Sequence, residues 1–525
     1  MAFSPSPQQA DFLNWVATGT GSCVLEAVAG AGKTTTLIEA IARTGGGVAL
    51  LAYNKKIAEE ISAKLKARGI DFRTAEAGTV HSFGFRAVRK AYPKVQVKDS
   101  KILDIIVDLI PPQMPTKDDP ADAKPVYHFL WHLRAEIAKL VSLAKQRALG
   151  VMGAIDDASL WHDIIAHFDL FSEEGEEGHT APLDDVIELA QEVLRRSNAM
   201  TDVIDFDDMV YLPLVRRLRF WRYNWIFVDE AQDTNPARRA LVRAMLQPGG
   251  RVVAVGDRHQ AIYGFTGADS DALDLIAQDF NCIRMPLTTT YRCPRAVVEF
   301  AQQWVSHITC AATAPEGRVS TITYADLLEG YDLDGSDAIL CRNTKPLVSL
   351  AFKLIRQGVA CKVEGRDIGK GLIALATRWK RVKTLHGLEV NLGEYQEREI
   401  AKALAKKQET KAQAVEDQCD TLRVIIASCR AKRQDSIEAV TNAIDTMFAD
   451  NIRGILTLST IHKSKGREWP RVFFLDRKGT LPSPYARQQW QLEQENNLCY
   501  VAATRAMETL IEVLGEPRNQ ESREG

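Results

Sequence analysis

The chain has 525 residues, of which 46% are hydrophobic and 26% charged, and a formal net charge of −2. This length exceeds what one hydrophobic core supports, so we expect several domains. No apolar run is long enough to span a bilayer, the N-terminus MAFSPSPQQADF lacks the pattern of a signal peptide, and the nine cysteines form no C-x-x-C pair. We therefore expect a cytoplasmic protein without a membrane segment, a disulfide framework or a zinc site.

Residues 26–37, EAVAGAGKTTTL, form a run of small residues that ends in Lys33 and Thr34, ahead of a helix-compatible stretch. Small residues let backbone N–H groups and a helix N-terminus face an anion, while Lys33 adds charge and the Thr34 hydroxyl can bind magnesium. The strict pattern has Gly where this chain has Ala27. The stretch predicts a phosphate loop, but it does not distinguish a kinase, a transporter ATPase, a recombinase or a motor.

Strand and helix patterns alternate along residues 22–90, which predicts a parallel sheet covered by helices. Helical periodicity takes over at 126–149, 182–197 and 205–220, and strand patterns return with WIFVDEAQD, RVVAVGD and NCIRMPL. The simplest interpretation is a helical block inserted into an unfinished sheet.

The second half of the chain repeats this plan. Strand-like AILCR (338–342) and VACKVEG (359–365) precede a charged helical block from about 370 to 450, and GILTLST and RVFFLD follow it. A coiled-coil hairpin over 392–450 is disfavoured by its poor heptad regularity. The expected boundaries are 1–90 and 201–285 for the first core, 91–200 for its insertion, 286–369 and 452–525 for the second core, and 370–451 for its insertion.

The segment NWIFVDEAQDTNP (224–236) ends an apolar strand in Asp229 and Glu230. Such a pair places one carboxylate to hold magnesium against bound phosphates and the other to orient or deprotonate an attacking water. Together with the Lys33 loop, this pair predicts nucleotide hydrolysis rather than nucleotide binding alone.

Six motifs in order resemble those of the UvrD/Rep-like superfamily 1 DNA helicases: AGAGKT, VDEAQD, VGDRHQAIYGFTGAD, LTTTYRCP, LSTIHKSKGREW and NNLCYVAATRA. The short chain and the segment AYNKKIAEE are most similar to the compact, phage-type or F-box-helicase-like branch. The resemblance implies an α/β fold with two RecA-like parallel-sheet cores, each interrupted by a helical insertion. It also implies an ATP-dependent DNA helicase that uses ATP and Mg²⁺.

Carried over by position, the resemblance implies a nucleotide site with parts on both cores. Charge that develops on the γ-phosphoryl oxygens would be stabilised by guanidinium groups of the second core, which would couple hydrolysis to closure of the two cores. The implied residues are Ala29, Gly30, Ala31, Gly32, Lys33, Thr34 and Thr35 for the phosphates, Gln9 and Tyr291 for the adenine, Glu468 for the ribose, Thr34 and Asp229 for the metal, Glu230 as base, Gln260 as γ-phosphate sensor, and Arg292 and Arg505 from the second core.

The same resemblance implies contacts with single-stranded DNA, in which Tyr263 and Phe265 stack on unpaired bases. Basic stretches at 216–222, 378–383 and 462–467 are further candidates, since binding by a chain of this net charge must be local. The remaining implied contacts are Tyr53, Asn54, His81, Phe83, Thr460 and His462.

The chain departs from the family pattern at three places. Thr35 stands where family members usually have Arg, Phe265-Thr266-Gly267 replaces WRG, and EQENNL replaces EERRL. These changes weaken secondary nucleotide and DNA contacts, whereas the hydrolytic set is complete.

The motifs favour a translocase that moves on single-stranded DNA, 3′ to 5′ by resemblance, and unwinds duplex from single-strand/duplex junctions. The alternative is a DNA-stimulated ATPase that displaces proteins or signals DNA state within a defence, repair or recombination complex without processive unwinding. In either case replication, repair or defence proteins are candidate partners. The small second insertion leaves this alternative open. We expect a monomer, located in the cytoplasm of a bacterial host if a phage encodes it.

Overall fold

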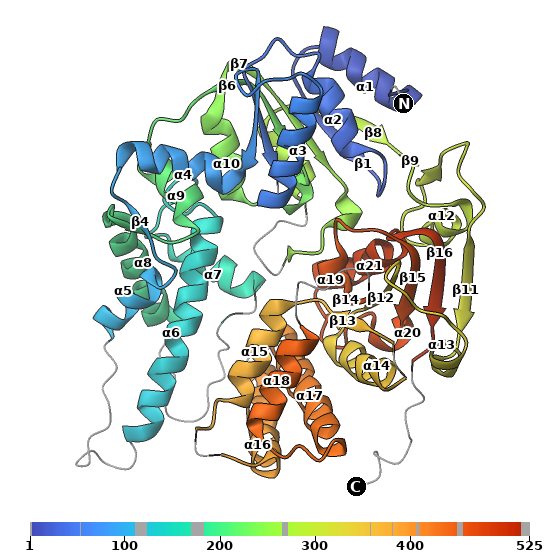
Figure 1. The fold of residues 1–525 in the computed structure, drawn as a ribbon. Coiled ribbons are helices and arrows are strands. Elements are labelled where there is room, and N and C mark those ends of the chain that lie inside the picture. Colours follow the sequence, from blue (N-terminus) through green and yellow to red (C-terminus); the bar gives the residue numbers. More distant parts are fainter. Residues whose placement is uncertain are drawn as a thin grey trace. The chain divides into compact units, whose positions relative to one another are not determined.

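The computed structural model describes residues 3–52, 54–110, 123–168, 170, 183–264, 271–357, 359–380, 382–405, 409–448 and 455–515. They form two compact units (Figure 1). The first consists mainly of Met1–Ala27 and Gly32–Leu287, and the second mainly of Val28–Ala31 and the chain from Thr288 onward. Each unit is built on a six-stranded sheet whose neighbouring strands are all parallel, so the predicted α/β fold with two parallel-sheet cores is confirmed.

The sheet of the first unit has the strand order β3-β2-β6-β7-β1-β8. The residues of β2, VALLA, are all buried, as expected for a parallel strand covered on both faces. β2 pairs with β6, which follows the insertion, so the later strands complete the sheet that the earlier ones begin. The elements are α1 (Pro7–Thr18), β1 (Ser22–Ala27), α2 (Lys33–Ile41), β2 (Val48–Ala52), α3 (Lys55–Ala67), β3 (Ala75–Thr79), α4 (Val80–Ala91), β6 (Tyr223–Val228), α10 (Pro236–Met245), β7 (Leu246–Gly256), α11 (Ala272–Asp279) and β8 (Cys282–Leu287).

Helices dominate the insertion of the first unit, and they pack around their own core, which includes Trp161, Ile137 and Ile187. The helix expected over 205–220 is shorter than predicted, because residues 205–207 form a turn and Arg217 adopts a positive φ of 50° after the helix ends. The elements are β4 (Gln96–Val97), α5 (Lys101–Leu109), α6 (Ala123–Gln146), α7 (Ala158–His167), α8 (Leu183–Ala199), β5 (Val203–Ile204) and α9 (Asp208–Val215).

The sheet of the second unit has the strand order β11-β16-β15-β12-β14-β13. β12 pairs with β14 and β15, so strands from either side of the second insertion again share one sheet. The elements are β9 (Thr289–Thr290), α12 (Arg295–Ala301), β10 (Thr309–Cys310), β11 (Arg318–Ile322), α13 (Tyr324–Glu329), β12 (Asp337–Cys341), α14 (Thr344–Arg356), β13 (Cys361–Val363), β14 (Leu456–Thr460), α19 (Ile461–Ser464), β15 (Trp469–Leu475), α20 (Arg477–Thr480), α21 (Gln489–Ala503) and β16 (Ala506–Val513).

Where the structure describes it, the second insertion consists of α15 (Arg366–Ala376), α16 (Leu385–Ala405), α17 (Glu409–Ala431) and α18 (Ile437–Met447). They lie together as a bundle (Figure 1). Leu388, Leu422 and Ile444 of these helices share one hydrophobic cluster with Ile339 and Leu458 of the sheet. The block is therefore a helical bundle whose hydrophobic core is continuous with that of the second sheet, rather than a projecting coiled coil. Across the part of the chain that the structure describes, no helix is both long and apolar enough to cross a membrane.

Candidate nucleotide and DNA sites

The predicted phosphate loop connects β1 to α2. Gly30 and Gly32 have positive φ angles of 72° and 75°, a conformation that glycine adopts without steric cost. α2 begins directly after Gly32, and no side chain caps its N-terminus. Backbone N–H groups at a helix N-terminus are suited to an anion, and phosphate binding at this loop remains a prediction.

The segment Val28–Ala31 groups with the second unit, although β1 and α2 belong to the first. Within the second unit the Gly30 carbonyl accepts a hydrogen bond from the Tyr291 N–H at 2.9 Å, and the Ala29 N–H donates to the Tyr500 hydroxyl at 2.9 Å. A Cβ on Gly30 would lie 2.6 Å from the Cβ of Arg292. Gly30 is thus required by close packing as well as by its φ angle.

Lys33 and the acidic pair lie together in the first unit. The Lys33 ammonium is 3.8 Å from Glu230 Oε1, and both side chains are largely buried. Asp229 is buried at the end of β6, and its Oδ1 accepts from the Glu230 N–H at 3.1 Å. Residues about 200 positions apart in the sequence therefore meet beside the N-terminus of α2, where Thr34 lies half-buried and Thr35 exposed.

A chain of hydrogen bonds links Glu230 to Gln260. Gln232 Nε2 donates to Glu230 Oε2 at 2.5 Å, while Gln232 Oε1 accepts from the Asp257 N–H at 3.0 Å. Gln260 Nε2 donates to Asp257 Oδ2 at 2.7 Å, and the Gln260 side chain is buried. Gln232 and Asp257 are not among the site residues predicted from the sequence, although they lie in the motifs VDEAQD and VGDRHQAIYGFTGAD. Their positions between the predicted base and the predicted γ-phosphate sensor could have indicated them.

Gln9 lies against the same loop, because a Cβ on Gly32 would be 3.2 Å from its Nε2. Its amide donates to the Thr36 hydroxyl at 2.9 Å and accepts from the Ser6 N–H at 2.9 Å. Gln9 therefore ties the N-terminus of α1 to α2. Its role toward adenine remains a prediction.

The second unit brings Arg292 and Glu468 together. Arg292 Nε donates to Glu468 Oε2 at 2.5 Å, and its Nη1 donates to the Thr504 carbonyl at 3.2 Å. The side chain of Tyr291 is 52% exposed beside them. Glu468, predicted for the ribose, is thus an ion-pair partner of a predicted catalytic arginine in this structure.

Arg505 is one of the largest fully buried side chains, with 1% of its surface exposed. Its Nε donates to the Val501 carbonyl at 2.9 Å, its Nη1 to the Arg467 carbonyl at 3.1 Å, and its Nη2 to the Thr504 hydroxyl at 3.2 Å. These three hydrogen bonds, all to groups of the second unit, hold the Arg505 guanidinium in place. It also lies one residue from the Thr504 carbonyl to which Arg292 donates.

Among the predicted DNA contacts, His81 is half-buried at the start of α4. Its ring lies 4.2 Å from the ring of Phe206, and burial, together with the positive charge of Arg238, lowers the pKa of His81 to about 4. Phe206 is 56% exposed. Phe206 is not among the DNA contacts predicted from the sequence. An aromatic residue among three aspartates, DFDD, is a pattern that could have pointed to an exposed ring.

Phe83 differs from the expectation of an accessible contact. It is 4% exposed, belongs to the core of the first unit, and packs edge-on against Tyr223. α4 is amphipathic, and Phe83 lies on its buried face together with Gly84, Ala87 and Val88. Its ring therefore supports the sheet and is not presented for stacking on a base.

The other predicted DNA contacts are scattered over both units. Asn54 caps α3 by accepting from the Ile57 N–H at 2.9 Å, and Tyr263 is half-buried. In the second unit Thr460 precedes α19, while burial, with Arg342 and nearby lysines, lowers the pKa of His462 to about 3. Tyr53 and Phe265 lie outside the described residues.

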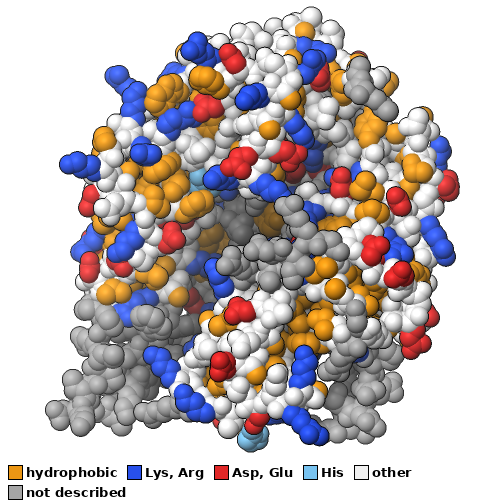
Figure 2. All heavy atoms as spheres, in the orientation of Figure 1, with side chains coloured by type: hydrophobic (Ala, Val, Ile, Leu, Met, Phe, Trp, Pro, Cys, Tyr) orange, Lys and Arg blue, Asp and Glu red, His pale blue; other side chains and the backbone are white. Residues whose placement is uncertain are grey.

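The basic stretch 216–222 lies beside the end of α4. The ring of the half-exposed Trp221 has the Lys90 ammonium 4.5 Å and the Arg86 guanidinium 5.5 Å from its centroid. Figure 2 shows that Lys and Arg side chains also lie close to hydrophobic ones on the visible face of the first unit. A surface of this composition suits a nucleic-acid backbone.

The side chains around Lys33 fit a magnesium–nucleotide complex. Asp229 and Thr34 offer carboxylate and hydroxyl oxygens, the ligands that Mg²⁺ prefers, and Mg²⁺ in such sites is typically held by one or two carboxylates together with phosphates and water. Among the described residues, no group of three or more His, Cys, Asp or Glu side chains is arranged to hold a metal by itself.

Comparison with known proteins connects these sites to a family. The description "UvrD/REP helicase N-terminal domain" matches residues 8–281, and "UvrD-like helicase C-terminal domain" matches residues 370–514. Both ranges carry site residues of the unit in which they lie.

Individual relatives are more distant. The chain is 26% identical over 332 residues to the ATP-dependent DNA helicase Rep of Escherichia coli, covering 57% of this chain and 43% of Rep. It is 24% identical over 336 residues to PcrA of Staphylococcus epidermidis, covering 60% of this chain and 42% of PcrA. It is 23% identical to UvrD2 of Mycobacterium bovis over 92% of this chain and 75% of UvrD2. The matched region thus spans less than half of the length of Rep and of PcrA. The match to the UvrD/REP helicase N-terminal domain nevertheless covers more than half of this chain, and on this basis the chain belongs to the UvrD/Rep helicase family.

Proposed function

We propose that this protein is an ATP-dependent translocase that moves along single-stranded DNA, 3′ to 5′, and unwinds duplex DNA. The observation that carries the proposal is the hydrogen-bonded set in the first unit, which joins the Lys33 ammonium, Glu230 and Gln260. Such a set has the parts that phosphoryl transfer to water requires: a phosphate-binding cation, a base and a γ-phosphate sensor. The family match supports this assignment.

In the proposed reaction, Lys33 and the N-terminus of α2 bind the phosphates, and Glu230 orients the attacking water and accepts its proton. When bound with ATP at Asp229 and Thr34, Mg²⁺ neutralises phosphate charge. Hydrogen bonds through Gln232 and Asp257 link Gln260 to Glu230, so a change at the γ-phosphate would alter the positions of both the Gln260 and the Glu230 side chains.

Arg292 and Arg505 would stabilise charge that develops during transfer. Both guanidinium groups are held by backbone carbonyls of the second unit, so little reorganisation is needed when they act. If the two units act on one nucleotide, hydrolysis would be coupled to their closure, and closure repeated on bound DNA would produce movement.

DNA binding would rest on aromatic stacking and on phosphate contacts. We propose that Phe206, with the neutral ring of His81 beneath it, stacks on an unpaired base, as does Tyr263. Both are side chains of the first unit. The partners would be single-stranded DNA and single-strand/duplex junctions, and the protein would act as a monomer in the bacterial cytoplasm, where the DNA of bacterial hosts lies.

A strand-displacement assay tests the proposal. Duplexes with a 3′ tail or a 5′ tail are compared at saturating ATP and Mg²⁺, beside ATP turnover with and without single-stranded oligonucleotide. We expect DNA-stimulated turnover and displacement from the 3′-tailed duplex. Stimulated turnover without displacement would favour the alternative of a protein-displacing or regulatory ATPase, for which the small α15–α18 insertion is the supporting feature. Turnover that ignores DNA would contradict both.

A further inference from the structure

A tight turn at residues 205–208 carries Phe206. The Asp205 N–H donates to Asp208 Oδ2 at 3.1 Å, and the Asp208 N–H donates to Asp205 Oδ1 at 2.8 Å. Each aspartate thus caps the backbone of the other, and the exposed ring between them lies against His81. These bonds fix the shape of the turn but do not by themselves fix its position on the protein.

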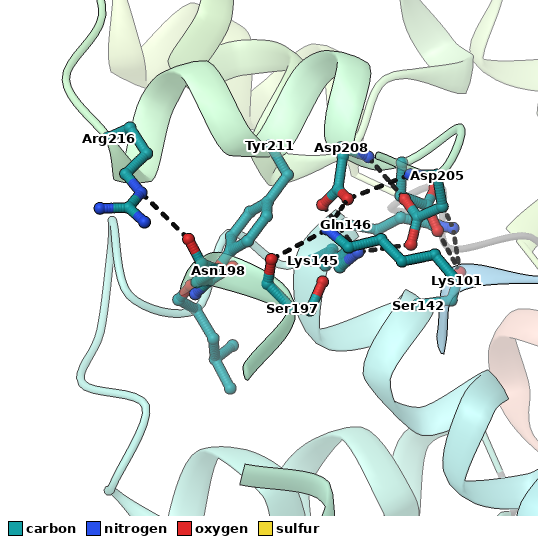
Figure 3. A network of polar contacts seen from close by, with 12 residues as sticks. Lys101, Ser142, Lys145, Gln146, Ser197, Asn198, Asp205, Asp208, Tyr211 and Arg216 are labelled. Carbon is teal, nitrogen blue, oxygen red and sulfur yellow. Dashed lines mark hydrogen bonds and ion pairs between the residues drawn. The ribbon is translucent and has the colours of Figure 1, made fainter. Parts of the chain in front are cut away.

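Two buried lysines from the helical insertion fix that position. Lys101, at the start of α5, donates to Asp208 Oδ2 at 2.7 Å and to the Ser197 carbonyl at 2.8 Å. Lys145, near the end of α6, is 2.5 Å from Asp205 Oδ2 and 2.7 Å from Asp208 Oδ1. Figure 3 shows both lysines directed at the two aspartates from different helices.

The charges in this cluster are deeply buried. The side chains of Lys101, Lys145 and Asp208 have no exposed surface. Burial alone would raise the pKa of Asp208, but the ammonium groups of Lys145 and Lys101 hold that pKa below its ordinary value. Burial alone would lower the pKa of Lys145, but Asp208 and Asp205 raise it. The two partners therefore keep each other ionised.

The third aspartate of the turn is also attached to the insertion. Asp207 accepts from the Ser142 hydroxyl of α6 at 2.5 Å, and burial raises its pKa. α6 therefore contacts the turn through Ser142 and Lys145, and α5 contacts it through Lys101.

Stability alone is a weak reason for such a cluster, since buried ion pairs can often be replaced by apolar residues without loss of stability. Directional contacts, in contrast, specify one arrangement of the groups that they join. Here they join two helices of the insertion to the turn that carries Phe206.

We propose that Lys101 and Lys145 are positioning residues, through which the helical insertion holds the 205–208 turn so that Phe206 stacks on an unpaired base. The proposal rests on the proposed function, because it requires that the first unit binds single-stranded DNA. It adds that the insertion sets the affinity of this site through buried charges rather than through contacts of its own with DNA.

The test compares full-length variants by fluorescence anisotropy with a labelled single-stranded oligonucleotide, by thermal melting and by DNA-independent ATP turnover. The network variant is Lys145→Met/Asp205→Asn, which removes one charge of each sign and leaves the Lys101–Asp208 pair. Phe206→Ala reports the stacking itself. Ile187→Ala, in the buried core of the same insertion, is the control for a general loss of stability.

We expect Phe206→Ala to weaken binding about 5-fold or more, as loss of one stacked base predicts. The network variant should weaken binding by a similar factor with unchanged DNA-independent turnover, and adding Phe206→Ala to it should cost little more, because both changes remove the same contact. Ile187→Ala should lower the melting temperature but change affinity less than about 2-fold.

The proposal is overturned if the network variant binds DNA normally, if its effect multiplies with that of Phe206→Ala, or if Ile187→Ala loses as much affinity. If the network variant does not fold, Lys145→Arg is tested in its place. Arginine keeps the positive charge but is larger than the lysine that the fully buried site accommodates. Weakened binding by a folded Lys145→Arg supports the proposal, and unchanged binding overturns it. Wild-type protein that does not bind single-stranded DNA would instead contradict the proposed function.

Discussion

Arg505 offers the most demanding test of the proposed hydrolytic mechanism. The residue is 472 positions from Lys33 in the sequence and has no local reason to affect a phosphate loop. If it stabilises charge on the transferring phosphoryl group, its removal should cost roughly 10³-fold or more in hydrolysis, which corresponds to about 4 kcal/mol. Nucleotide binding should be nearly normal, because that charge develops after binding.

The structure decides which substitution tests this. Arg505→Ala would leave the Val501 and Arg467 carbonyls without their charged donor. At about 1.5–3 kcal/mol for each hydrogen bond to a charged group, the loss could reach roughly 3–6 kcal/mol, a large share of a typical unfolding free energy. Arg505→Lys keeps the positive charge and is the better first variant, although a point charge on a flexible stem does not reproduce the planar fork.

The assay is steady-state ATP turnover with saturating oligonucleotide, beside nucleotide binding by fluorescence and thermal melting. Arg471→Lys is the matched control. Arg471 donates through Nε and Nη2 to the buried Asp337 at 2.7 Å each; it lies on β15 of the same unit as Arg505 and is in no predicted nucleotide contact. We expect both variants to melt at lower temperature and only Arg505→Lys to lose turnover. A folded Arg505→Lys with near-normal turnover, or an equal loss in Arg471→Lys, would refute the reasoning.

Three further predictions follow from other parts of the molecule. Lys33→Ala should abolish ATP turnover while the melting temperature changes little, because only one 3.8 Å ion pair is lost; persisting DNA-stimulated turnover would remove the phosphate-cradle assignment. Tyr263→Ala should weaken DNA affinity by about 1–3 kcal/mol in anisotropy titrations performed at several salt concentrations, whereas lost thermal stability at unchanged affinity would assign the ring to packing. Folding lowers the pKa of His81 to about 4 and that of His462 to about 3, from 6.5, so between these values and pH 6.5 the unfolded chain binds more protons than the folded chain. The melting temperature should therefore be highest above about pH 6.5 and should fall as the pH is lowered toward 3. His462→Gln should reduce this pH dependence.

Local sequence determined the parts of this protein that depend on backbone conformation and on the order of elements. Three features can be predicted from the sequence: the glycines of the phosphate loop, the acidic pair after β6 and the apolar strands. A positive φ, a strand end and a buried strand each restrict the residue types at those positions. The alternation of strands and helices likewise predicted two parallel sheets, each resumed after an insertion.

Which side chains far apart in the sequence meet depends on the tertiary structure, because hydrophobic periodicity reports only local conformation. Phe83 is predicted as a DNA contact from its motif, yet it lies on the buried face of α4. Phe206, in an acidic turn that the sequence does not single out, is exposed. Nothing in the local sequence marks Lys101 and Lys145 as buried, because only the approach of Asp205 and Asp208 from another segment makes their burial tolerable. Burial of a charge depends on a partner, and for these lysines the partner is supplied by a segment 60 to 107 residues away, which no local pattern can specify.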